Sequence, residues 1–129
     1  MATLKISDIS VGDWVGYNGK SYRTVIVDAL DQTATIFGND EQGDIHIDQL
    51  APIPITAEIL EKNGWGMRTF GHSTCECNGT YVGVVNTTRD YGVSVIDDDG
   101  IRMGVDYLLY VHQLQHALRL AGVEKEINL

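Results

Sequence analysis

Two histidines with helical spacing come closest to an enzyme motif in this sequence. His112 and His116 flank Gln113-Leu114-Gln115, and positions i and i+4 of a helix share one face, the spacing of the H-E-x-x-H zinc proteases. Such a protease needs a glutamate as its general base, and the neutral amide of Gln113 cannot take that role. We therefore expect no catalytic residue and no metal site here, but two partly exposed histidines beside a packed helix face. A non-catalytic metal site is the alternative.

A second group of potential metal ligands lies in one short polar segment. His72, Cys75 and Cys77 could supply one nitrogen and two sulfur ligands. A closed zinc site takes four ligands, usually as two separated pairs, and no second pair follows. We interpret the segment as a loop with reduced thiols. The alternative is a small metal-dependent or thiol enzyme that uses these residues together with His112 and His116.

Common cofactor and hydrolase motifs are absent from the sequence. It contains no G-x-x-x-x-G-K-[ST], G-x-G-x-x-G or G-x-S-x-G pattern, so we expect no cofactor.

Three aromatic residues, Trp14, Tyr17 and Tyr22, cluster around an Asn-Gly turn near the N-terminus. An aromatic patch on an SH3-like barrel can bind peptides, but a half-buried packing role is the favoured interpretation.

The charge balance bears on the kind of partner. The 129 residues carry a net charge of −9, and their nine lysines and arginines are scattered. Binding to nucleic acid or to an anionic membrane depends on clustered basic residues, so we expect neither. A protein partner or self-association suits an acidic surface. With no long apolar run, no signal-peptide pattern and two cysteines, the sequence favours a cytoplasmic location.

The histidine pair belongs to the one long helical pattern, residues 107–122. Gly122 would end the helix. A second, narrower stripe lies opposite the main apolar arc and consists of Leu109 and Leu120 with Gln113 and His116 between them. We expect the stripe to be covered within the fold, with contact to another chain as the alternative. The main arc comprises Tyr107, Tyr110, Val111, Leu114, Ala117, Leu118 and Ala121. The candidate partner-binding residues are Leu109, His112, Gln113, His116 and Leu120.

The first 51 residues are typical of a small β-unit. Asn18-Gly19 is a strong two-residue hairpin signal, because a type I′ turn needs positive φ at both central positions. Short alternating segments with tight turns predict an SH3-like barrel or a bent meander. The predicted strands are residues 12–17, 20–28, 33–37 and 44–47, with a polar loop at 38–43.

The remaining residues, 52–129, predict a helix, an antiparallel sheet and a covering helix. Thr56 is a good N-cap for a helix over residues 57–63, and Gly64 can end it. The fold class is therefore α+β, and we expect both parts to pack as one compact unit. Asn78-Gly79 opens three strands before a helix, as Asn18-Gly19 does, which leaves an internal duplication open. The predicted strands are 65–70, 80–86, 91–96 and 101–105, with a loop at 71–79 and a tail at 123–129 able to form an edge strand.

Short motifs also resemble a known group of proteins. They are Val11-Gly12-Asp13-Trp14-Val15, the segment from Pro52-Ile53-Pro54-Ile55-Thr56 to Trp65, and Tyr110-Val111-His112-Gln113-Leu114-Gln115 with Ala121-Gly122. Together they resemble a group of small uncharacterised bacterial proteins that are often associated with prophages. The resemblance implies no activity, cofactor or site residue. We therefore expect a non-catalytic interaction or accessory protein, with the small metal-dependent or thiol enzyme as the alternative.

Overall fold

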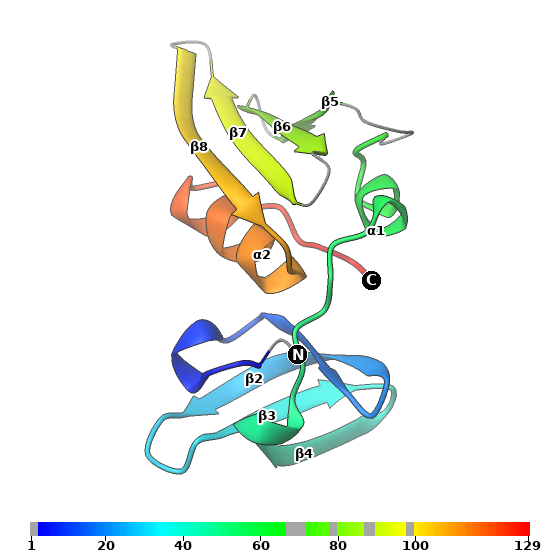
Figure 1. The fold of residues 1–129 in the computed structure, drawn as a ribbon, viewed down its shortest axis with the longest axis vertical. Coiled ribbons are helices and arrows are strands. Elements are labelled where there is room, and N and C mark those ends of the chain that lie inside the picture. The colour runs from blue at the N-terminus through cyan, green and yellow to red at the C-terminus, as the bar shows by residue number, and fades with distance from the viewer. Residues whose placement is uncertain (1–2, 67–71, 78–79, 87–89, 98–99) are drawn as a thin grey trace. The chain divides into compact units, whose positions relative to one another are not determined.

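The computed structural model of the chain describes residues 3–66, 72–77, 80–86, 90–97 and 100–129. The chain divides into two compact units, Met1–Ile53 and Pro54–Leu129, which are described here one at a time (Figure 1). The predicted α+β class is confirmed, since the described residues form two four-stranded antiparallel sheets, a short helix and a C-terminal helix. The predicted division at residue 51, with both parts packed together, stays a prediction.

The first unit is a meander in which each strand pairs with the next. Its hairpin turn is the predicted one, because Asn18 and Gly19 have φ values of 50° and 76°. Residues 41–43, predicted as loop, belong to a strand, since their backbone pairs with β3 despite their polar side chains. The elements are 3-10 turns at Ile6–Asp8 and Ile47–Gln49 and the strands β1 (Trp14–Tyr17), β2 (Lys20–Asp28), β3 (Thr33–Gly38) and β4 (Glu41–His46).

One edge of this first sheet is closed and the other is open. Gly16 on β1 exchanges two backbone hydrogen bonds with Ala51, at 2.8 and 2.9 Å. At the opposite edge β4 pairs with β3 alone among the described strands. Alternate residues of β1, β2 and β3 point into one core, which follows from the two-residue period of a strand. The buried core is Leu4, Ile9, Val15, Tyr22, Ala34, Ile36, Ile47 and Leu50.

The second unit contains a strand that the sequence had not predicted. Residues 72–77, predicted as part of a loop, form β5, whose backbone pairs with β6 along its whole length. The predicted strand at 65–70 lies outside the described residues from position 67 onward, and Trp65 and Gly66 are irregular. The elements are α1 (Ala57–Lys62), β5 (His72–Cys77), β6 (Thr80–Asn86), β7 (Tyr91–Asp97), β8 (Gly100–Leu108) and α2 (Val111–Leu120).

Helix α1 begins where its sequence predicts and ends at Lys62, one residue before the predicted end. The Thr56 hydroxyl accepts a hydrogen bond from the Ile59 amide at 3.2 Å, which is the expected N-cap. Gly64 adopts a φ of 99°, the left-handed conformation that ends a helix. Between them, buried Asn63 donates to the carbonyl of Asn128 at 2.7 Å and accepts from its amide at 2.7 Å. The tail is therefore tied to the end of α1 by a side chain, and it does not form the predicted edge strand.

Helix α2 begins four residues later than predicted. Tyr107 and Leu108 extend β8, since Leu108 pairs with Tyr91 of β7, and Tyr107 has a φ of 65° and is 78% exposed. Figure 1 shows α2 beside the end of β8. The predicted burial of the second stripe is wrong, because Leu109 is 44% exposed and Leu120 is 80% exposed. The helix buries the remaining arc residues from Val111 onward.

One order of elements occurs twice along the chain. Four sequential antiparallel strands, with an Asn-Gly pair between the first two, are followed by a helix each time, and the first of these helices, α1, belongs to the second unit. Finding β5 makes this parallel closer than the sequence alone indicated.

Neither described helix is long and apolar enough to cross a lipid bilayer.

Trp65 joins three parts of the second unit. Its side chain is fully buried, and its indole N–H donates to the carbonyl of Val82 on β6 at 2.9 Å. The Lys125 ammonium of the tail lies 5.1 Å from the ring centre, within range of a cation–π interaction. Trp65, which lies just beyond the end of α1, is thus bonded to the sheet and covered by the tail.

We expect Trp65→Phe to lower the free energy of unfolding by about 2–4 kcal/mol, because it removes this hydrogen bond and leaves empty space. Urea unfolding followed by far-UV circular dichroism measures the loss. Trp14→Phe is the control; it replaces a half-buried indole, over which Arg23 lies at 4.5 Å, with a smaller ring and should cost less than about 1 kcal/mol. Equal losses in the two variants would contradict the anchoring role of Trp65.

Candidate functional site

The two histidines of α2 form part of an aromatic stack. His112 is buried, and its ring lies parallel to that of Tyr110, with centroids 5.9 Å apart and planes 8° apart. His116 meets His112 edge to face at 5.8 Å and 78°. Such ring contacts stabilise a packed surface. The pair therefore has a packing role in addition to any role in binding.

Gln113 caps the helix that carries the histidines. Its side-chain oxygen accepts hydrogen bonds from the backbone amides of Leu109 and Tyr110, at 2.8 and 3.0 Å. This is one half of a capping box, which satisfies amides that a helix N-terminus leaves without partners.

Of the candidate partner-binding residues, Leu109 and Leu120 are exposed, His116 is half-buried and His112 is buried. Their role in binding a partner stays a prediction.

The two cysteines lie on an edge strand. Cys75 and Cys77 are free, half-buried thiols at alternate positions of β5, so they share one face of the strand. Burial raises the pKa of the Cys77 thiol, and the neighbouring Cys75 raises it further, while Lys125 opposes the shift. A raised pKa reduces the thiolate fraction at neutral pH and hence the reactivity of Cys77 as a nucleophile.

The described residues do not gather into a metal site. Across the described ranges, no group of three or more histidine, cysteine, aspartate or glutamate side chains could hold a metal ion. His72 begins β5, where its backbone pairs with Val85. The residues of the alternative enzyme are thus distributed over a strand and a helix of the second unit.

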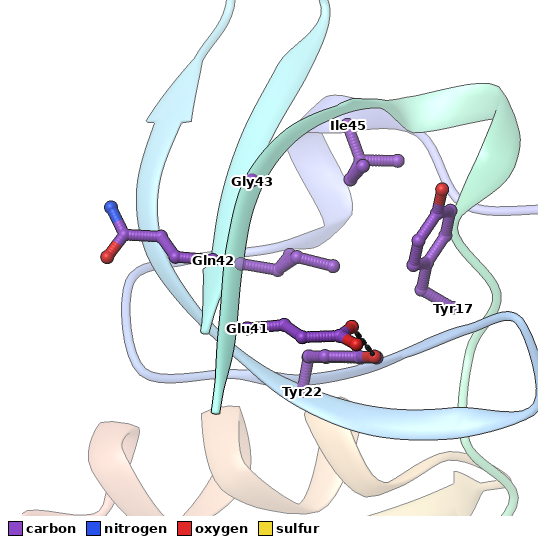
Figure 2. A pocket seen from close by; sticks show the side chains of 7 residues that line it. Tyr17, Tyr22, Glu41, Gln42, Gly43 and Ile45 are labelled. Atoms are coloured by element: carbon purple, nitrogen blue, oxygen red, sulfur yellow. Dashed lines mark hydrogen bonds between the residues drawn. The ribbon is translucent and has the colours of Figure 1, made fainter. Parts of the chain in front are cut away.

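A different site, the tyrosine pocket, lies in the first unit. It is a hollow of about 110 Å³ lined by Tyr17, Tyr22, Ile36, Glu41, Gln42, Gly43 and Ile45. Figure 2 shows both tyrosines, Glu41 and Ile45 around one space, with the Gln42 side chain pointing away from it. The lining combines aromatic and aliphatic surface with one carboxylate.

The register of the strands explains how this pocket forms. Gly43 on β4 pairs with Ile36 on β3, so β4 places no side chain opposite Ile36, which is itself buried and lines the pocket. A Cβ atom at Gly43 would meet only the Ile45 side chain, at 3.9 Å. Glu41 pairs with Gly38, where a Cβ would lie 3.2 Å from the Tyr22 ring. A glycine at position 38 thus leaves room for the Tyr22 ring beside β3.

Tyr22 and Glu41 are joined across this space. The Tyr22 hydroxyl donates to Glu41 Oε2 at 3.0 Å, and the Tyr17 ring meets the Tyr22 ring edge to face at 6.1 Å. Burial raises the pKa of the Tyr22 hydroxyl, and the hydrogen bond and negative charge of Glu41 raise it further. Tyr22 is therefore a neutral donor at neutral pH, and it holds the carboxylate against the aromatic wall.

Only part of this pocket is recognisable in the sequence. Tyr17 and Tyr22 were recognised as an aromatic cluster, while Glu41 and Gly43 were assigned to a polar loop. The available signal was the alternation of Glu41, Gly43 and Ile45, which places them on one face if the segment is a strand. Trp14, the third aromatic residue of the cluster, stacks with Arg23 and does not line the pocket.

Comparison with known proteins gives no relative for this chain: no protein family, curated protein or solved structure matches it significantly. The site must therefore be judged on its own geometry.

We expect Gln113→Glu to keep the free energy of unfolding within about 0.5 kcal/mol of wild type, because a carboxylate oxygen can make the same cap. Gln113→Ala should cost about 1 kcal/mol. Although Gln113→Glu creates the protease motif, we expect no bound zinc in native mass spectrometry, since His112 is buried in its stack. One equivalent of zinc retained by Gln113→Glu would contradict this assignment.

We also expect alkylation of Cys77 by iodoacetamide to be slow at pH 7 and to accelerate as the pH rises past the range of an ordinary thiol, because its pKa is raised. In Cys75→Ser, which removes a neighbour that raises this pKa, Cys77 should react faster at pH 8 than in wild type. Peptide mapping by mass spectrometry measures both rates. Fast alkylation of Cys77 at pH 7 would instead favour a thiol nucleophile.

Proposed function

We propose that this chain is a non-catalytic interaction protein that binds a segment of a partner protein at the tyrosine pocket. The observation that carries the proposal is a preformed hollow whose floor is apolar, whose wall is aromatic and whose rim carries one carboxylate. Binding sites commonly combine a mostly apolar lining with a few placed polar groups.

The position of the pocket supports binding of an extended segment. Glu41, Gly43 and Ile45 all belong to β4, the edge strand that pairs with β3 alone among the described strands. Extended peptides often bind along such edges and place alternate side chains in pockets. The charge of −9 supports a protein partner over nucleic acid.

The cellular setting is part of the same proposal. We propose a cytoplasmic accessory protein, which the two free cysteines support. A link to prophages or other mobile elements is proposed on the motif resemblance alone. The alternative, a small metal-dependent or thiol enzyme, has weaker support, because the raised pKa of Cys77 disfavours its thiolate.

Filling the pocket tests this proposal. Peptides selected from a displayed library on the wild-type chain should bind Gly43→Leu at least about tenfold more weakly, because the added side chain occupies the hollow. The variant should be as stable as wild type or up to about 1 kcal/mol more stable, since glycine is unfavourable within a strand.

Gln42→Leu is the matched control. Gln42 borders the pocket, but its side chain points away from it (Figure 2), so the substitution adds apolar bulk outside the hollow. It should leave the selected peptides bound as tightly as wild type. A selection that yields no binder, or binders that Gly43→Leu retains, would contradict binding at the tyrosine pocket.

A further inference from the structure

We propose that the tyrosine pocket recognises a lysine or arginine side chain of the partner segment. This inference rests on the proposed function, and it names the chemical class of the group that enters the hollow. It follows from three features of the pocket: its carboxylate, its aromatic wall and its apolar floor.

The carboxylate and the rings favour a cation. Glu41 is bound to the Tyr22 hydroxyl through Oε2, and a carboxylate has acceptor capacity for further donors. An ammonium or guanidinium group that enters beside it can donate to this carboxylate and approach the faces of aromatic rings. Half-buried Tyr17 supplies such a ring, and buried Tyr22 packs edge to face with it in the same pocket.

The apolar part of the lining suits a side chain with an apolar stem. Ile36 and Ile45 line the pocket, and Gly43, which pairs with Ile36, adds no side chain there. Lysine and arginine bury their methylene groups against apolar surface while their charged ends reach polar groups. A hollow of about 110 Å³ has room for one such side chain rather than for a larger ligand.

The surrounding charges point the same way. No lysine or arginine lines the pocket, and the chain as a whole carries a charge of −9. Two cations belong to the same hairpin: exposed Lys20 pairs with Tyr17 in the β1–β2 ladder, and Arg23 lies over the Trp14 ring. A basic partner segment therefore meets a carboxylate in the pocket and an attractive long-range field.

The test is an NMR titration of the full-length, ¹⁵N-labelled chain with three acetylated and amidated pentapeptides. They share the sequence Gly-Ser-X-Ser-Gly, where X is lysine, norleucine or glutamate. We expect the lysine peptide to shift the amides of Tyr17, Tyr22, Glu41 and Gly43. It should bind about tenfold more tightly than the norleucine peptide, which has a similar stem without the charge.

Two matched variants separate the pocket carboxylate from the general charge. Glu41→Gln should weaken the lysine peptide to the level of the norleucine peptide, because it removes the charge and keeps an acceptor for Tyr22. Asp40→Asn removes the same formal charge from the neighbouring exposed residue, which does not line the pocket. It should change the affinity by less than about twofold at physiological ionic strength.

Each other outcome overturns a definite part of the inference. If the norleucine or glutamate peptide binds at the pocket as tightly as the lysine peptide, recognition of a cation is wrong while binding at the pocket stands. Equal weakening by Glu41→Gln and Asp40→Asn would show only a general charge effect and would also overturn it. If no peptide shifts the pocket amides, both this inference and the proposed function fail.

Discussion

The pairing register of β3 against β4 is the constraint on which the first unit depends. It places Ile36 opposite Gly43 and Gly38 opposite Glu41, so the same pairs build the core and open the pocket. Because successive strand residues point to opposite faces, a slip of one position would turn Glu41, Gly43 and Ile45 away from the tyrosines. Burial of Ile36 in the core works against such a slip. A stable sheet and a shaped pocket are thus produced by one set of contacts.

The second unit relies more on side chains that bridge distant segments. Trp65 bonds the end of α1 to β6, and Asn63 bonds it to the C-terminal tail. Gln113 caps α2, and the histidines beside it stack with Tyr110. His112, Gln113 and His116, whose types and spacing most resemble a metal-binding motif in the sequence, therefore have structural roles here. The tyrosine pocket lies instead in the first unit.

Local signals predicted much of the fold and little of the site. The Asn18-Gly19 turn, the Thr56 cap and the Gly64 stop are where the sequence placed them, because each depends on one residue's conformation or one hydrogen bond. The strand β5 was missed because its polar residues resemble a loop, and only pairing with β6 makes them a strand. The start of α2 was misplaced for a similar reason, since Tyr107 and Leu108 extend β8.

By itself, the sequence determined the α+β class, the Asn18-Gly19 turn, most of the described strands and the C-terminal helix from Val111 onward, since hydrophobic period and turn chemistry are local properties. Only the tertiary structure decided that Leu109 and Leu120 are exposed and that Gln113 is a cap. It alone brought Glu41 to Tyr22, which are 19 positions apart in the chain. Such pairs depend on strand register and on the absence of a side chain at Gly38 and Gly43, which no local pattern encodes.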